Sequence, residues 1–132
     1  MNDQKITAQL ILAEQIKFDS IGNCHSAKNI LNKISVPLFP AAVIADVLAK
    51  IYLETHDYET EAEFTIISPD DRIIFIMTSL PVKSLRAKEA IPGFDMAFNV
   101  RFPVVEEGNY FCRLVIDGEL LCQYPFYVNS KE

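Results

Sequence analysis

The sequence predicts an all-β protein, an antiparallel β-sandwich of about eight or nine short strands. Three observations lead to this prediction. Apolar and polar side chains alternate over several runs, most strictly from Phe94 to Phe102. Turn-forming pairs such as Asp117-Gly118 separate these runs, and the runs follow one another at the short spacing that is typical of sandwiches.

Length and composition allow one domain with its own core, covering residues 1–132. A chain of about 150 residues buries roughly two thirds of the surface that it exposes when unfolded. Half of the residues are hydrophobic, which is a high fraction for a small monomer. We therefore expect an apolar patch that meets a second copy of the chain or a protein partner.

The first elements are short. Thr7 to Glu14 is an apolar run that predicts a buried strand, and Gly22-Asn23 then favours a turn because both residues accept positive φ. Lys28 to Val36 is predicted to be the next strand. Pro37 and Pro40 follow, and they exclude a central strand at that point.

The segment 41–54 is ambiguous. Its apolar residues fit helical spacing, and Asp46, Lys50 and Glu54 form a charged i, i+4 series on such a helix. Its context of neighbouring strands favours extended structure instead. We predict a strand from about Leu48 to Glu54, with helix as the alternative.

The second half of the chain begins with a predicted hairpin, formed by strands at Thr60–Ile67 and Arg72–Thr78 around the turn sequence Ser-Pro-Asp-Asp. Ser79 to Gly93 is the longest irregular interval, and its composition is compatible with one short helical turn around 84–90. Three consecutive strands follow, and their predicted ranges are Phe94–Phe102, Gly108–Ile116 and Glu119–Val128.

The register of the last hairpin depends on its turn. A two-residue loop would place Arg113 opposite Cys122, whereas a three-residue loop with Gly118 in a bulge separates polar from apolar side chains better. We prefer the second register. It places Cys112 directly opposite Cys122 as a candidate thiol pair, although buried thiols acting as small hydrophobic groups are the more ordinary interpretation.

The segments Gly22–Pro40 and Glu107–Phe126, which contain Asn-Ile-Leu-Asn, Phe-Pro, Gly-Asn-Tyr and Ile-Asp-Gly-Glu, resemble an uncharacterised family of small bacterial proteins described as a domain of unknown function. This resemblance covers most of the chain. It implies an immunoglobulin-like β-sandwich and a strand at Leu48–Glu54, and it brings no catalytic residues.

The net charge and the amino-terminal sequence restrict which partners and which cellular location we expect. The net charge is -6, so we expect no nucleic-acid partner, because phosphate backbones would repel the chain. No signal peptide and no apolar run of about 20 residues is visible, so we expect no membrane partner and a cytoplasmic location.

Two charged clusters are candidate protein contacts. An acidic stripe on one predicted strand contains Glu59, Glu61 and Glu63. A basic cluster in the irregular interval contains Lys83, Arg86 and Lys88. Either cluster could meet an oppositely charged partner, and the two could meet each other between copies. A solvated surface is the ordinary interpretation of both.

No catalytic motif, metal-ligand spacing or cofactor loop is found in the sequence, and the adjacent pair Cys24-His25 has no second ligand cluster. We therefore predict a non-enzymatic protein-binding or regulatory module that can self-associate, without cofactor or metal. The alternatives are an acidic decoy that occupies a basic partner, and a ligand-binding or enzymatic protein. The latter would have a pocket between its sheets, predicted to be lined by Phe94, Phe98, Tyr110 and Tyr124.

Overall fold

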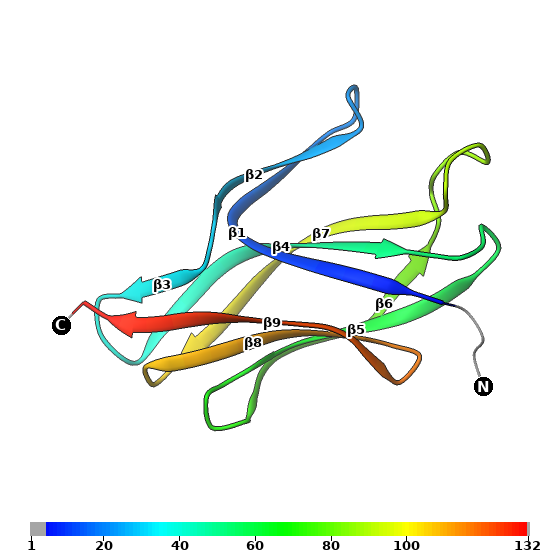
Figure 1. Cartoon of the computed structure of the whole chain (residues 1–132). Helices are drawn as coiled ribbons and strands as arrows, with labels where there is room; N and C mark the ends of the chain where they lie inside the picture. The colour runs from blue at the N-terminus through cyan, green and yellow to red at the C-terminus, as the bar shows by residue number, and fades with distance from the viewer. Residues whose placement is uncertain (1–4, 132) are drawn as a thin grey trace.

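A computed structural model describes residues 5–131, which form nine strands and no helix (Figure 1). The strands are β1 (Thr7–Asp19), β2 (Cys24–Ile30), β3 (Lys33–Val36), β4 (Ala41–Tyr52), β5 (Glu59–Ile67), β6 (Ile73–Lys83), β7 (Gly93–Val104), β8 (Gly108–Ile116) and β9 (Glu119–Ser130). No helix with the length and hydrophobicity of a membrane span occurs in these residues.

The strands form two sheets that pack face to face. One sheet has the order β2-β1-β4-β7, and the other has the order β3-β9-β8-β5-β6. All neighbouring strands are antiparallel except β3 and β9, which are parallel. The predicted all-β sandwich is confirmed. The three carboxy-terminal strands are not contiguous, however, because β7 lies in the sheet opposite β8 and β9.

The core lies between the inner faces of the two sheets. Alternate residues of β7 point into it, and the Phe98 ring meets Phe64 of the other sheet edge to face at a centroid distance of 5.0 Å. The Phe102 and Phe126 rings make a second such contact at 5.9 Å. Aromatic pairs of this kind join the two layers, as the alternation over Phe94–Phe102 predicts.

Tyr110 anchors the start of β8. Its ring is fully buried and stacks on Phe126, while its hydroxyl donates a hydrogen bond of 2.7 Å to the backbone carbonyl of Glu106. A buried tyrosine bonded to the backbone a few residues upstream is typical of immunoglobulin-like sandwiches.

The ambiguous segment is a strand throughout, because β4 lies between β1 and β7 and pairs with both. Val43, Val47 and Ile51 share its buried inner face. The predicted range of 48–54 was therefore wrong at both ends, since the strand begins at Ala41 and ends at Tyr52. Pairing on two sides outweighs the helical spacing of its side chains.

Two other intervals differ from the prediction. The predicted strand at Lys28–Val36 is interrupted at Leu31 and Asn32, where the chain leaves one sheet and enters the other. The irregular interval 79–93 is shorter than predicted, because β6 continues to Lys83. Its remainder contains a turn in which the Ala90 amide donates to the Ala87 carbonyl at 2.9 Å, and no helix.

The β8–β9 hairpin turns at Asp117-Gly118, as predicted, with positive φ at both residues. The preferred register was wrong, because Ile116 pairs with Glu119 and a bulge then shifts the pairing by one residue. Cys112 consequently lies opposite Tyr124, and Cys122 lies opposite Leu114.

Candidate functional site

Two segments project from the same side of the sandwich, the tip of the β1–β2 hairpin and the β6–β7 loop at 84–92 (Figure 1). A groove of about 850 Å³ lies between them, over β4 and β7. We call this groove the cradle. It is lined by Phe18, Cys24 and His25 from the hairpin, Leu48 and Lys50 from β4, Leu85, Arg86 and Ala87 from the loop, and Asp95 from β7.

The hairpin wall of the cradle presents an aromatic surface. Phe18 and His25 are cross-strand neighbours whose ring centroids lie 4.9 Å apart, and 55% of Phe18 is exposed. At the turn, the Asp19 carboxylate accepts a hydrogen bond of 3.0 Å from the Ile21 amide. Ile21 at the tip is 97% exposed. This wall therefore presents large apolar groups to solvent, away from the core.

The other wall of the cradle is the 84–92 loop, which presents Leu85 and is anchored by hydrogen bonds. Leu85 is 71% exposed, although the loop that carries it is well anchored. The Ser84 hydroxyl accepts hydrogen bonds from the Arg86 and Gly93 amides, each at 3.3 Å. On the far side, His56 Nε2 lies 2.8 Å from the Ala90 carbonyl oxygen. These contacts hold the exposed leucine in a defined position.

Charged groups form the floor. Asp95 bridges two cations, with Oδ1 at 2.7 Å from Lys50 Nζ and Oδ2 at 3.0 Å from Arg86 Nη2. Gly93 allows the guanidinium to approach, because a Cβ at that position would lie 2.9 Å from Arg86 Cζ. Burial alone would raise the pKa of Asp95, but the hydrogen bonds from Lys50 and Arg86 outweigh it, so the net pKa is lowered.

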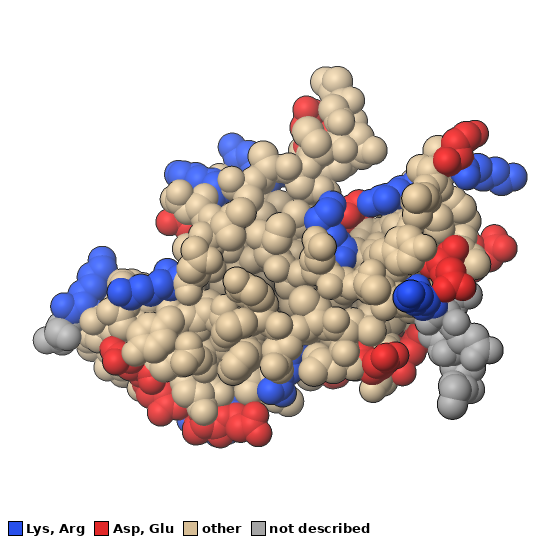
Figure 2. Space-filling view, in the orientation of Figure 1, with Lys and Arg blue, Asp and Glu red and all other residues tan. Residues whose placement is uncertain are grey.

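The cradle combines apolar walls with a positively charged floor. Lys50 and Arg86 share one carboxylate, which leaves an excess positive charge in a chain whose net charge is -6. Figure 2 shows a hollow between the two projections, in which blue and red atoms lie next to each other among mostly tan walls. Such a surface can hold an apolar side chain and a nearby carboxylate at the same time.

The predicted acidic stripe and the predicted basic cluster meet at one ion pair, and their other members lie in different parts of the molecule. Glu59 and Glu61 are exposed on β5, in the sheet opposite the cradle floor, and Glu63 is half-buried on the same strand. Lys83 lies opposite Glu59 on the neighbouring strand, with Nζ and Oε1 3.9 Å apart. Arg86 lines the cradle. The sixth candidate, Lys88, is exposed in the same loop.

The candidate thiol pair is not directly opposed across the strands. Cys112 and Cys122 lie on the same face as diagonal neighbours, and both are free thiols. Burial raises the pKa of Cys112 to about 12, with a smaller contribution from Cys122. Burial also raises the pKa of Cys122. Both thiols are therefore neutral near pH 7 and act as small hydrophobic groups.

The four aromatic residues predicted to line one pocket occupy separate places. Phe94 borders the cradle, Phe98 packs on Phe64, and Tyr110 is buried beside Phe126. Tyr124 lines a different cavity, between β1 and β9. Among residues 5–131, no group of three or more His, Cys, Asp and Glu side chains is placed to hold a metal ion.

Sequence reasoning did not place Phe18, His25 or Leu85 in a contact site, and it considered His25 only as a metal ligand beside Cys24. A signal for the first two was present, since they are symmetrically placed about the turn at 20–23. Leu85 stands alone between polar residues in an irregular interval. Nothing in its sequence context indicates that it faces the β1–β2 hairpin.

No family model matches this chain, and no curated protein matches it. The chain is similar in structure to a β-glucosidase 3B from Thermotoga neapolitana in complex with glucose, with 14% identity and a TM-score of 0.45. It is also similar to a β-glucosidase from Listeria innocua in complex with glucose, with 6% identity and a TM-score of 0.48. The likeness covers 98% and 96% of this chain but 16% of each glucosidase chain. At these TM-scores it carries no argument about function.

Proposed function

We propose that this protein is a non-enzymatic binding module that holds a segment of a protein partner in the cradle. The observation that carries the proposal is the pair of exposed apolar side chains, Phe18 and Leu85, on opposite walls of one groove. Exposed apolar groups that face a common hollow typically mark interaction sites. Recognition by loops on a rigid sandwich is also a common arrangement.

The chemistry of the cradle defines the partner segment. Its walls favour an aromatic or branched aliphatic side chain, which would lie between Phe18 and Leu85. Its floor favours an acidic residue, because Lys50 and Arg86 supply two cations against one carboxylate. A short peptide with an apolar residue beside Asp or Glu meets both requirements.

A peptide display screen against the purified chain tests this proposal. We expect enriched peptides to combine an aromatic or aliphatic residue with Asp or Glu. Binding should weaken at least about tenfold in Phe18→Ala and in Leu85→Ala, which corresponds to about 1.4 kcal/mol. Ile44→Ala is the matched control, because Ile44 is also exposed but lies outside the cradle.

The proposal is contradicted if enriched peptides bind the two cradle variants as tightly as they bind Ile44→Ala. Screening at two salt concentrations adds a further check. The contribution of the floor should weaken at high salt, whereas the apolar contribution should persist.

Two further parts of the prediction belong to this proposal. We propose a cytoplasmic location, which the three free thiols at Cys24, Cys112 and Cys122 support, since such thiols persist in reducing compartments. Self-association remains a prediction. Light scattering at increasing protein concentration tests it, and Phe18→Ala distinguishes a contact through the cradle from a contact elsewhere.

A further inference from the structure

A second cavity lies on the other side of β1, where β1 of one sheet faces β9 of the other. The chain crosses between the sheets here, through Leu31 and Asn32. The Leu31 amide donates a hydrogen bond of 2.8 Å to the Leu12 carbonyl, and the Tyr127 amide donates one of 3.1 Å to the Asn32 carbonyl. The crossing segment is thus hydrogen-bonded to both sheets.

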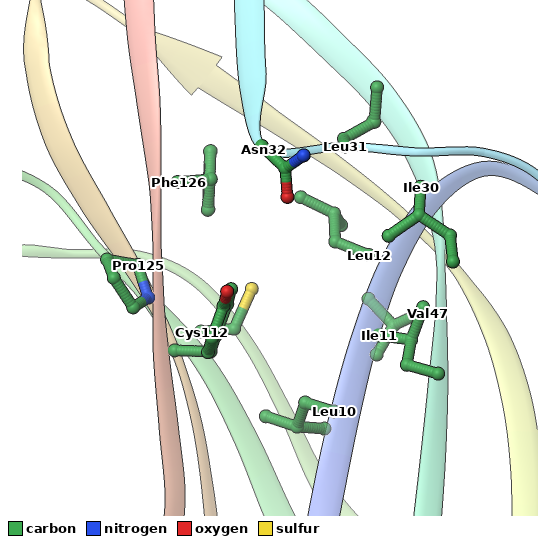
Figure 3. A pocket seen from close by; sticks show the side chains of 11 residues that line it. Leu10, Ile11, Leu12, Ile30, Leu31, Asn32, Val47, Cys112, Pro125 and Phe126 are labelled. Atoms are coloured by element: carbon green, nitrogen blue, oxygen red, sulfur yellow. The ribbon is translucent and has the colours of Figure 1, made fainter.

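The space below this crossing segment is a pocket of about 180 Å³. Its walls are mostly apolar, and its principal side chains are Leu10, Leu12, Leu31, Val47, Cys112 and Phe126. Figure 3 shows an open centre between β1 and β9 that is bordered by Leu10, Leu12, Cys112 and Phe126. The lining, which is drawn from residues 10–126, contains no Asp, Glu, Lys, Arg or His.

The polar side chains among the lining residues are those of Asn32, Cys112 and Tyr124. In Figure 3 the carboxamide of Asn32 and the sulfur of Cys112 both point toward the open centre. The Cys112 thiol is deeply buried and neutral, so it contributes little beyond packing. The Asn32 side chain is more accessible and offers both a donor and an acceptor to a ligand.

Size and polarity together define the ligand. A dry apolar cavity of about 150 Å³ binds benzene in another protein, so a pocket of this volume suits one aromatic ring or a small fused pair. A charged ligand would lose its hydration without gaining an opposite charge. A sugar would leave several hydroxyl groups without partners, because the walls are apolar.

We propose that the pocket between β1 and β9 binds a small neutral aromatic molecule, with one hydrogen-bonding group of the ligand directed at Asn32. The ring lies among Leu12, Val47 and Phe126, and the polar group lies at the mouth. This site shares no lining residue with the cradle, so its test is independent of the proposed protein-binding function.

Titration of the full chain with phenol, indole, toluene and benzoate tests the proposal, with the thermal midpoint and the backbone amide resonances as readouts. We expect phenol and indole to raise the midpoint in a saturable way and to shift the resonances of Leu12, Leu31 and Phe126. Benzoate, which has the same ring with a negative charge, should bind at least about tenfold more weakly.

Two variants place the ligand. Leu31→Phe enlarges a side chain of the pocket lining and should weaken phenol binding at least about tenfold, whereas Leu38→Phe makes the same change at an exposed position outside it. Asn32→Leu is a second variant at an exposed residue, whose backbone bond to Tyr127 is retained. It should abolish the preference for phenol over toluene while toluene still binds.

Three results would overturn the proposal. The first is no saturable response to phenol or indole, and the second is an equal response to benzoate. The third is equal phenol binding by Leu31→Phe and Leu38→Phe or, should Leu31→Phe fail to fold, an unchanged preference for phenol in Asn32→Leu.

Discussion

The two hairpins β8–β9 and β1–β2 have the same antiparallel pairing but different surroundings. The β8–β9 turn is tied to the rest of the protein, because the Asp117 carboxylate accepts hydrogen bonds from the Tyr58 and Thr60 hydroxyls. The β1–β2 tip projects from the sandwich instead (Figure 1). The difference shows that local turn chemistry makes a hairpin, whereas the faces of its strands decide whether it packs.

The strand faces explain this difference. On β8, Tyr110, Cys112 and Leu114 form a continuous buried row, and the opposite sheet covers them. On β2, every residue except His25 is exposed, so the hairpin has no second layer against it. Backbone pairing with β1 holds β2 in place, together with a hydrogen bond of 2.9 Å from the Asn29 side chain to the Glu14 carboxylate.

Replacing a phenylalanine by alanine in each hairpin should produce the largest contrast. Phe126→Ala removes a ring that is 3% exposed and stacked on Tyr110, so we expect a loss of about 3–5 kcal/mol in the free energy of unfolding. Phe18→Ala removes an exposed ring and should cost less than about 1 kcal/mol. Urea denaturation measures both, and equal losses would show that the β1–β2 tip is packed.

Replacing an aspartate at each turn should give a smaller contrast. Asp117→Ala removes the acceptor of two hydroxyl groups and a residue suited to positive φ, so we expect a loss of about 1–3 kcal/mol. Asp19→Ala removes one exposed bond to a backbone amide and should cost about 0.5 kcal/mol. Thermal denaturation of the two variants measures which one loses more stability. A larger loss in Asp19→Ala than in Asp117→Ala would contradict this prediction.

The ion pairs at the floor of the cradle should make a pH-dependent contribution. The pKa of Asp95 is lowered below its ordinary value of 3.8, so its contribution is fully present above about pH 4 and is lost as the pH falls through the lowered pKa. We expect about 1 kcal/mol or less from this group. Asp95→Asn should reduce the acid-dependent loss of stability. An unchanged pH profile in this variant would contradict the role of the carboxylate.

A polar residue at the hairpin tip should have the smallest effect. Ile21 is 97% exposed, so Ile21→Ser should change the free energy of unfolding by no more than about 0.5 kcal/mol. Chemical denaturation against the wild type checks this value. A larger loss would mean that the tip folds back onto the sandwich, and the distinction between the two hairpins would then fail.

Much of the fold was predictable because its strands alternate strictly. Local sequence determines the structure of the run Phe94–Phe102 and of the turn Asp117-Gly118, and both occur as predicted. The start of β4 was not predictable in this way, since pairing with two neighbours decides it. The bulge beside Leu114, which together with the two-residue turn places Cys122 opposite Leu114 and not opposite Cys112, also leaves no clear mark in the sequence.

The candidate site was less predictable than the fold. Of the six charged residues predicted as contacts, Arg86 lines the cradle, while Glu59 and Lys83 form an ion pair on neighbouring strands. The cradle depends on a hairpin and a loop that are far apart in sequence, and no local pattern encodes their proximity. Exposed apolar residues such as Phe18 become informative only when the packed surface is known.

The parallel pairing of β3 with β9 has a consequence for the order of folding. Ser35 and Asn129, whose side chains share a hydrogen bond of 2.8 Å, are 94 positions apart in the chain. During synthesis, β3 therefore emerges long before the strand that it must pair with. Closing so long a loop makes folding slow compared with a protein of local contacts. Because β9 lies between β3 and β8, β3 joins the five-stranded sheet only after β9 has been made.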